Sequence, residues 1–201
     1  MKEIVKIVLT GGPCAGKSTT LEALKQKFNG RLLVVPEVAT ILLSGGFPIP
    51  GQHVTHSQEW QSAFQTAVCT TQVSLEQAYE LVACEKGINI LVCDRGQLDG
   101  AAYTPGGIKE FCKLYKINEA QAHKRYKAVI HLESVATANS QLYGKAGNEN
   151  RYETLDEAES LEHRTRAAWK NHTNWYFVPG NSGIDDVIKG ATSFFTSQIP
   201  V

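Results

Sequence analysis

The feature that most constrains this chain is the stretch GGPCAGKSTT, residues 11–20, which follows directly on the apolar run IVKIVLT. Gly11, Gly16, Lys17 and Ser18 fill the pattern GxxxxGK[ST], a glycine-rich loop between a strand and a helix. Glycines let the backbone N–H groups of such a loop turn inward toward phosphate oxygens, and the helix that follows adds partial positive charge. The sequence therefore predicts a loop that holds the β-phosphate of a nucleotide.

The side chains of this loop predict how ATP and Mg²⁺ are held. We expect Lys17 to reach the β- and γ-phosphates and the Ser18 hydroxyl to help hold Mg²⁺ between them. The alternative, a glycine turn capped by a serine, leaves the lysine unexplained. Cys14 either fills space or offers a thiol whose oxidation would block nucleotide binding. The predicted nucleotide site comprises Gly11, Gly12, Pro13, Cys14, Ala15, Gly16, Lys17, Ser18 and Thr19.

Short apolar runs alternate along the chain with helix-like stretches, which is the rhythm of repeated βαβ units. Runs such as INILVC are continuously apolar, as expected of strands that are covered on both faces in a parallel sheet. The predicted fold class is α/β: a P-loop NTPase three-layer sandwich, with a mostly parallel sheet of about five strands and helices on both faces. Strands are expected at 4–10, 32–35, 88–93, 128–132 and 175–178, and helices at 17–28, 57–86, 155–172 and 184–197.

Composition limits the size of the fold and the class of partner. A chain of 201 residues with 42% hydrophobic residues can bury one good core, so we expect a single domain over 1–201. Twenty basic and twenty acidic residues cancel, so no overall field attracts long nucleic acid or an anionic membrane. The chain shows neither a secretory signal nor an apolar run of membrane-spanning length, and its five cysteines are scattered. We expect a cytoplasmic protein with a small-molecule partner, and a homodimer is a possible assembly.

Two carboxylates follow predicted strands, where open parallel sheets place their chemistry. Asp94 ends the run INILVCD and is suited to bind Mg²⁺ directly or through water, while Arg95 is suited to contact substrate or the transferring phosphate. A surface Asp–Arg turn pair is the alternative for these two. Glu37 follows LLVVP, where it would accept a proton from a substrate hydroxyl. Its alternative role is a carboxylate at a helix N-terminus.

The long helix expected over 57–86 presents a mixed aromatic and amide face. Trp60, Phe64, Ala67 and Thr71 recur at three- and four-residue steps, with Gln65 beside them. Such a face would stack on a planar ring through Trp60 or Phe64 and read its edge through Gln65. Packing of the aromatics on the sheet is the alternative. The candidate substrate contacts are Glu37, Trp60, Gln65, Arg95, Asp99 and Tyr103, although Asp99 could equally cap the next turn.

Phosphoryl transfer also requires exclusion of water and a cation for the migrating group. We expect a lid at 143–166, where the polar segment YGKAGNENRY precedes a helix. Arg151 is the candidate cation. At 100° per residue, Arg164 and Arg166 flank the inner stripe of that helix on opposite sides and are not expected to serve one phosphate. Surface pairing with Glu157, Glu159 or Glu162 is the alternative for these two arginines.

Four stretches resemble a known family over nearly the whole chain: GGPCAGKST, PEVA, DRGQLDGAAY and NENRYETLDEA. They are similar to the small AAA-type P-loop domain of bacterial ribosylnicotinamide kinases and related ATP-binding proteins, and more distantly to deoxyribonucleoside and nucleoside monophosphate kinases. The resemblance to deoxyribonucleoside kinases implies that Glu37 is the base and Asp94 a magnesium ligand, with Arg95 beside the reacting hydroxyl. EWQSAFQTAVC also resembles a nucleoside kinase helix whose glutamine binds the base, which implies this role for Gln65. The arginine that those kinases carry several residues later is absent here.

The leading hypothesis is an ATP- and magnesium-dependent phosphotransferase, a kinase acting on a hydroxyl of a small nucleoside or nucleotide-like acceptor. Its catalytic residues would be Lys17, Glu37, Asp94, Arg95 and Arg151, and its metal ligands Ser18 and Asp94. The alternative is a nucleotide-dependent switch or binding module without kinase activity. A Ras-type GTPase is disfavoured because the sequence contains neither NKxD nor DxxG. A polynucleotide kinase is disfavoured because no basic stripe would neutralise a long phosphate chain.

Overall fold

A computed structural model describes residues 3–143 and 154–198 of the chain. The strands are β1 (Val5–Thr10), β2 (Leu33–Val35), β3 (Ile90–Asp94), β4 (Ala128–Leu132) and β5 (Trp175–Val178). The helices are α1 (Lys17–Lys27), α2 (Val38–Ser44), α3 (Gln58–Lys86), α4 (Gly107–Leu114), α5 (Glu119–Lys124), α6 (Val135–Ala138), α7 (Leu155–Trp169) and α8 (Ile184–Gln198). Two 3₁₀ turns, η1 (Asp99–Tyr103) and η2 (Ser140–Leu142), complete the secondary structure of the described residues.

The five strands form one parallel sheet in the order β2-β3-β1-β4-β5. β1 therefore lies at the centre, between β3 and β4. Leu9 is in register with Asp94 on one side, and Thr10 is in register with His131 on the other. Because parallel strands end at the same edge of the sheet, the segments after β1, β3 and β4 meet there.

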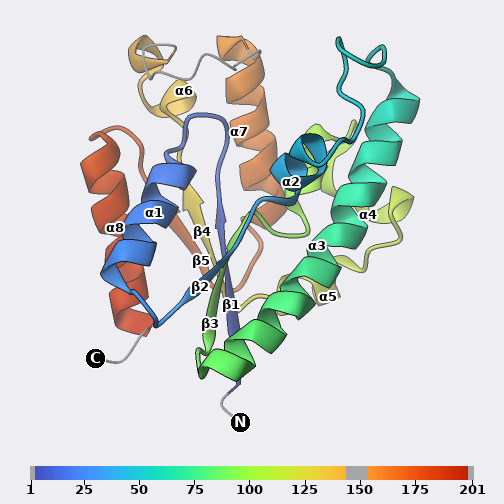
Figure 1. Ribbon diagram of the computed structural model, residues 1–201. Coiled ribbons are helices and arrows are strands. Elements are labelled where there is room, and N and C mark those ends of the chain that lie inside the picture. The colour runs from blue at the N-terminus through green and yellow to red at the C-terminus, as the bar shows by residue number, and fades with distance from the viewer. Residues whose placement is uncertain (1–2, 144–153, 199–201) are drawn as a thin grey trace.

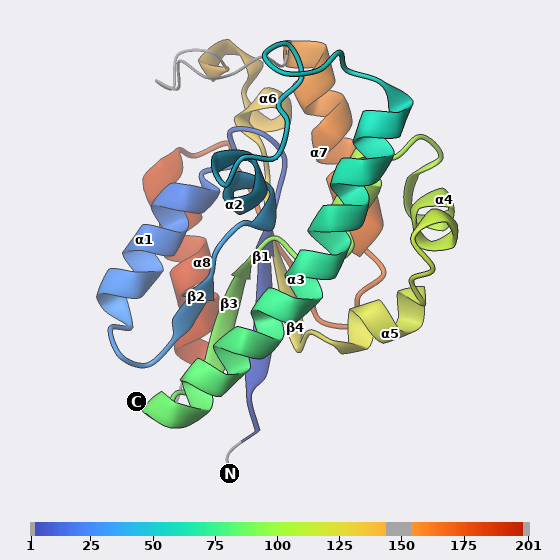
Figure 2. The ribbon, with the colours of Figure 1, turned by 45° about the vertical axis from the view of Figure 1, so that its right-hand side comes forward.

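Helices cover both faces of this sheet (Figures 1 and 2). Side chains of successive β1 residues point to opposite faces: Ile7 and Leu9 pack in a buried cluster with α1 and α8, and Val8 packs in a second cluster with α3, α4 and α7. Such burial on both sides explains why the strand sequences are continuously apolar. The predicted three-layer α/β fold of the P-loop NTPase type is confirmed.

Several element boundaries differ from the sequence expectation. The elements expected from the sequence do not include α2, α4, α5 or α6, all of which are eight residues long or shorter. β3 begins at Ile90 rather than Ile88, since the Ile88 N–H still bonds the Ala83 carbonyl at the end of α3. Gly87 ends that helix in the left-handed conformation. α7 ends at Trp169, a turn earlier than expected.

Candidate active site

The glycine-rich loop connects the centre of the sheet to α1. Its backbone takes positive φ at three points, Gly11 (146°), Cys14 (63°) and Gly16 (76°). The Lys17 ammonium folds over the loop and donates to the carbonyls of Gly11, at 2.9 Å, and Gly12, at 2.8 Å. Burial lowers the pKa of Lys17 to about 8, and the neighbouring charge of Arg95 contributes to this lowering. The loop thus holds a cation in partly desolvated surroundings.

The start of α1 has no side-chain cap. Gly16 is the N-cap and provides no side-chain cap for the first turn, so the backbone N–H groups there are available to a ligand. Ser18 and Thr19 in this turn are exposed. Ala15 is buried against Gly11, and Pro13 and Cys14 are half-buried. All nine residues predicted for the nucleotide site therefore lie on one strand-to-helix connection.

Asp94 ends β3 directly beside this loop. Its Oδ1 is buried and has no hydrogen-bond partner among the described residues. Burial raises the pKa of Asp94 to about 6, and the negative charge of Glu37 adds to this effect. A carboxylate oxygen without a partner fits Mg²⁺, which prefers oxygen ligands. The Ser18 hydroxyl and Asp94 are the residues that could hold this ion.

A cage of protein ligands is not needed for such an ion. Within residues 3–143 and 154–198, no group of three or more His, Cys, Asp or Glu side chains could hold a metal. Mg²⁺ at nucleotide sites commonly takes one or two protein oxygens and completes its shell with phosphates and water. The pair formed by Ser18 and Asp94 has that chemistry.

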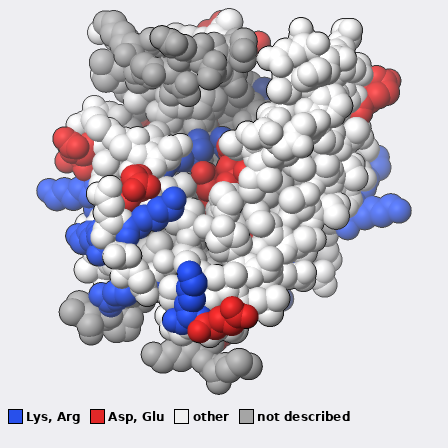
Figure 3. Space-filling model, in the orientation of Figure 1, with Lys and Arg blue, Asp and Glu red and all other residues white. Residues whose placement is uncertain are grey.

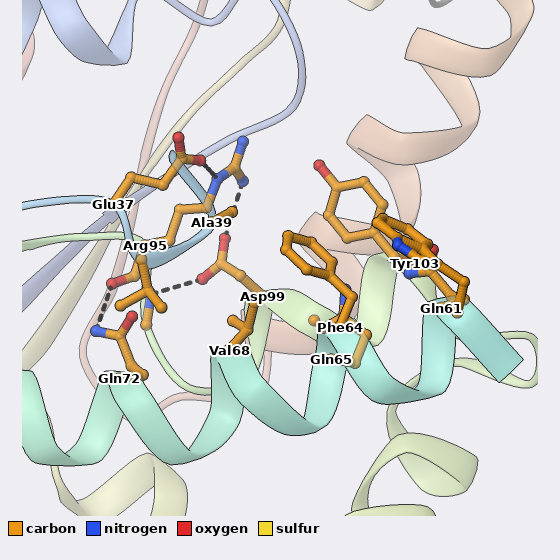
Figure 4. Close-up of a pocket in the computed structure, with 14 residues that line it drawn as sticks. Glu37, Ala39, Gln61, Phe64, Gln65, Val68, Gln72, Arg95, Asp99 and Tyr103 are labelled. Atoms are coloured by element: carbon orange, nitrogen blue, oxygen red, sulfur yellow. Dashed lines mark hydrogen bonds and ion pairs between the residues drawn. The ribbon is translucent and has the colours of Figure 1, made fainter. Parts of the chain in front are cut away.

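Arg95 lies between the carboxylates of Glu37 and Asp99 (Figure 4) and also reaches the phosphate-binding loop. Its backbone is left-handed, with φ of 67°, and its side chain is largely buried. The guanidinium donates from Nε to Glu37 Oε1 at 2.6 Å and from Nη1 to the Gly11 carbonyl at 3.3 Å. Arg95 therefore contacts both the phosphate-binding loop and the predicted base.

Glu37 is the N-cap of α2, immediately after β2. Its Oε2 accepts a hydrogen bond from the Thr40 hydroxyl at 2.5 Å. Burial alone raises the pKa of Glu37, but the charge of Arg95 and the hydrogen bond from Thr40 leave that pKa below its ordinary value. Glu37 is therefore an ionised carboxylate at neutral pH. Its position combines the helix N-terminal role with a place in the site.

Asp99 holds Arg95 from the other side. Its Oδ1 accepts from the Thr10 hydroxyl at 2.5 Å and from Arg95 Nη1 at 3.2 Å. Its Oδ2 accepts from the Gly96 N–H at 2.8 Å and from Trp169 Nε1 at 2.9 Å. With four donors on two oxygens and only 4% of the residue exposed, Asp99 fixes the DRG turn and the arginine in it.

A pocket of about 260 Å³ opens beside these charges. Figure 4 shows α3 side chains rising toward Arg95 and Asp99. All six predicted substrate contacts line it: Glu37, Trp60, Gln65, Arg95, Asp99 and Tyr103. Further lining residues are Val38, Ala39, Gln61, Phe64, Val68, Gln72, Gly96 and Gly100. The structure thus brings together residues from the start of α2, from α3 and from the turn after β3.

The aromatic wall of the pocket is braced by the loop before α3. Trp60 stacks on Phe64 with ring centroids 5.0 Å apart and an interplanar angle of 14°. Phe47 packs edge-on against both rings, and Trp60 Nε1 donates to the Pro48 carbonyl at 2.8 Å. Gln65 is buried, and its Oε1 has no partner within the described residues. A polar atom of this kind is available to a ligand.

Charge is distributed unevenly around this site. Figure 3 shows acidic and basic side chains gathered near the middle of the molecule, whereas the neighbouring surface over α3 carries almost none. Among the described residues that line the pocket, Arg95 is the only cation. The pocket is therefore mainly apolar, with an ion pair at one end.

Part of the predicted lid lies outside the described residues, including Arg151. α7 begins with a capping box between Thr154 and Glu157. Arg166 lies over the Phe177 ring, 4.5 Å from its centroid, and the Arg164 side chain is exposed and donates to the Ser160 carbonyl. Neither arginine lines the pocket.

The surface pairing considered for these arginines does not extend to Glu162, which is 2% exposed. Its Oε1 lies 2.5 Å from His131 Nε2, and its Oε2 accepts from the Gly12 N–H at 2.8 Å. The inward turn of Glu162 follows from its place beside the apolar stripe of α7, next to Leu161. Its partners come from β4 and the phosphate-binding loop.

Sequence reasoning missed Glu162, His131 and Trp169. Their contacts join residues that are 31 to 150 positions apart in the chain. The one signal in the sequence is the histidine inside the otherwise apolar strand AVIHL, because a buried imidazole requires a polar partner. Nothing local identifies Glu162 as that partner.

Comparison with known proteins supports this site. A family model for the AAA domain matches residues 6–183, which includes the phosphate-binding loop, all of the sheet except Val5, and the whole pocket. A search of curated protein sequences finds no similar protein. In the part of the chain that the structure describes, no helix is both long and apolar enough to span a membrane.

Proposed function

The chain belongs to the AAA domain family, whose P-loop binds nucleotide, and from this premise we propose that it is an ATP- and magnesium-dependent phosphotransferase. The proposed reaction transfers the γ-phosphoryl group of ATP to a hydroxyl of a small nucleoside-like acceptor. One observation carries the proposal: Arg95 bonds both Gly11 of the phosphate-binding loop and Glu37 at the pocket. A base and a cation thus meet at the junction of donor and acceptor sites.

On the donor side, the loop amides and the start of α1 would bind the β-phosphate, and Lys17 would leave its present carbonyl partners for phosphate oxygens. Ser18 and Asp94 would hold Mg²⁺, which when bound neutralises charge on the phosphates. The unpartnered Oδ1 of Asp94 supports that assignment. Lys17 and Arg95 would both stabilise negative charge as it develops on the transferred group.

On the acceptor side, Glu37 would accept the hydroxyl proton. Its lowered pKa keeps it ionised at neutral pH, and its side chain is 28% exposed, which leaves it accessible from the pocket. Arg95 orients this carboxylate through a 2.6 Å hydrogen bond. A general base held in one orientation within reach of the reacting hydroxyl is typical of phosphotransferases that act on alcohols.

The lining of the pocket favours an uncharged planar acceptor. Trp60 and Phe64 offer aromatic surface, and Gln65 offers a buried amide oxygen for a ring-edge donor. A nucleoside monophosphate would bring two negative charges beside Glu37, with Arg95 as the only described lining cation to meet them. We therefore propose a nucleoside rather than a nucleotide as the acceptor.

Arg151 remains a proposed contact to the transferred phosphate, carried by a lid over 143–166. Its role is tested by Arg151→Ala. If Arg151 closes over the phosphate, turnover falls while affinity for Mg-ATP is retained. Unchanged turnover would remove it from the site.

The proposed function is tested by product analysis. Purified protein is incubated with Mg-ATP and a panel of nucleosides and nucleoside monophosphates, and products are separated by chromatography. We expect phosphorylation of at least one nucleoside and none with the Glu37→Gln variant. Binding of Mg-ATP without transfer to any acceptor would contradict the kinase proposal and favour a nucleotide-dependent switch or binding module.

A further inference from the structure

The phosphate-binding loop is hydrogen-bonded to a buried carboxylate on α7. Glu162 Oε2 accepts the Gly12 N–H at 2.8 Å and the Ser134 N–H at 3.3 Å. The hydroxyl of Ser134 in turn donates to the Pro13 carbonyl. Two consecutive loop residues are therefore fixed from α7 and from the segment after β4.

The loop needs such support because of its backbone conformation. Cys14, the residue after these two ties, has φ of 63° although it carries a Cβ. A non-glycine residue keeps a left-handed conformation only where its surroundings hold it there. The inward direction of the loop N–H groups depends on this turn, because a nest of amides requires alternation of right- and left-handed residues.

α7 lies close to the loop at this point. A Cβ on Gly12 would lie 2.8 Å from Glu162 Oε2 and 3.0 Å from Glu162 Cα. Glycine at position 12 is therefore required by the approach of the helix, and not by its own φ. The helix and the loop are matched in shape as well as by the hydrogen bond.

His131 stabilises the buried carboxylate of Glu162 close to the predicted phosphate site. Glu162 Oε1 lies 2.5 Å from His131 Nε2, and both side chains are buried, at 2% and 0% exposed. Burial raises the pKa of Glu162, but the hydrogen bond and charge of His131 and the two backbone N–H groups leave it below its ordinary value. His131 itself is held by stacking on Phe177, with ring centroids 5.8 Å apart.

We propose that Glu162, oriented by His131, is a positioning residue that holds the phosphate-binding loop in its nucleotide-binding conformation. The inference rests on nucleotide binding at this loop, as in the proposed function, but not on transfer to an acceptor. The oxygens of Glu162 bond backbone N–H groups of Gly12 and Ser134 and the ring of His131. Glu162 acts through the backbone of Gly12 and, with Ser134, keeps the following residues in the left-handed turn.

The test compares Mg-ATP affinity, measured by calorimetry, among variants of the full chain. Glu162→Ala removes both backbone hydrogen bonds, and we expect affinity to fall by about 10-fold or more. Glu162→Gln can place its amide oxygen where Oε2 lies, and its NH₂ can donate to His131 Nε2 when the imidazole is neutral and carries its proton on Nδ1. With that tautomer we expect affinity within about threefold of the unaltered protein. Glu159→Ala, on the same helix but less buried, is the matched control and should bind normally.

Rescue by Gln separates positioning from a general loss of stability, which is followed in parallel by thermal unfolding. Should Glu162→Ala fail to fold, Ser134→Ala keeps the Ser134 N–H bond to Glu162 but removes the hydroxyl that bonds the Pro13 carbonyl and caps α6 at the Ala136 N–H. This variant is expected to weaken Mg-ATP binding several-fold. Unchanged affinity in Glu162→Ala, or in Ser134→Ala where that variant replaces it, would overturn the proposal. Glu162→Gln binding as weakly as Glu162→Ala would also overturn it. Because no acceptor is present, failure of the kinase proposal leaves this result intact.

Discussion

The donor and acceptor halves of the proposed site differ in the chemical groups that form them. The donor half is mainly backbone: carbonyls that hold Lys17, amides that follow Gly16, and left-handed residues within one short connection. The acceptor half is made of side chains from three separate elements, which meet around a pocket of about 260 Å³. Arg95 is the residue that contacts both.

This difference teaches how the two halves can vary. A backbone cradle recognises phosphate, a group common to all nucleotides, and tolerates few substitutions because it depends on special φ values. A side-chain pocket recognises the rest of a ligand and can change one residue at a time. The two halves should therefore respond separately to mutation, except at Arg95. The following predictions challenge or sharpen that separation.

The largest expected effect is that of Glu37→Gln on turnover. The change keeps the shape of the side chain but removes the base, so kcat should fall by about 100- to 10,000-fold. Steady-state kinetics with the acceptor identified by product analysis measures this. Affinity for Mg-ATP should stay within about twofold, since Glu37 belongs to the acceptor half. A variant that turns over normally would eliminate Glu37 as the base.

Lys17→Ala should produce the complementary defect. Loss of the ammonium is expected to weaken Mg-ATP binding by roughly 100-fold, because a partly buried charge-assisted contact to phosphate is removed. Calorimetry measures this, with Lys25→Ala on the exposed side of α1 as the control. Acceptor affinity, followed by tryptophan fluorescence, should not change. A parallel loss of both affinities would show that the halves are not separable.

The pH dependence of Mg-ATP binding should sharpen the account of the donor half. With a pKa of about 8 in the free protein, Lys17 is charged below pH 8 and increasingly neutral above it. Bound phosphate requires the charged form, so affinity should change little between pH 7 and pH 8 and fall by up to about tenfold per pH unit above pH 8. Calorimetry at pH 7, 8 and 9 measures this.

Lys17→Arg is the matched control for that experiment, because a guanidinium stays protonated over the whole range. Its Mg-ATP affinity, even if lower overall, should not show the same fall above pH 8. An affinity of the unaltered protein that stays level up to pH 9 would mean that burial does not lower the pKa of Lys17.

The smallest expected effect is that of Trp60→Ala on the acceptor half. Loss of one stacking surface should raise the KM of the acceptor by about 2- to 10-fold, with little change in kcat or in the KM for ATP. Trp60→Phe keeps an aromatic ring against Phe64 and should behave nearly as the unaltered protein. An equal rise in both KM values would place Trp60 outside the acceptor pocket.

The sequence indicated more of the site than its local motifs alone would suggest. The positions after predicted strands point to Glu37 and Arg95, and the DRG turn points to Asp99. Helical spacing points to Trp60 and Gln65, and the family resemblance also implies Gln65. All five line one pocket. Their roles in binding and catalysis stay predictions. The rule that worked is geometric: the ends of parallel strands meet at one edge of the sheet.

Other features could not be found in this way. α2 is seven residues long and has no periodicity to distinguish it from a loop, yet it positions Glu37 and Thr40. The sequence suggests Glu162 only as a surface partner of Arg164 or Arg166 and gives no role to Trp169, whereas in the structure Glu162 bonds the phosphate-binding loop and Trp169 bonds Asp99. Each of these contacts pairs one side chain with a partner from a distant element. The spacing of residues along the chain does not predict such a pairing.

By itself, the sequence determined the phosphate-binding loop, the alternation of strands and helices, and the three-layer fold, because these depend on local backbone preference and on patterns of apolar residues. The tertiary structure decided the strand order that places Asp94 beside the loop, the closing of the pocket around Arg95, and the burial of Glu162 with His131. These depend on which distant side chains satisfy each other's charge and hydrogen bonds once water is excluded, and that is settled only when the elements pack.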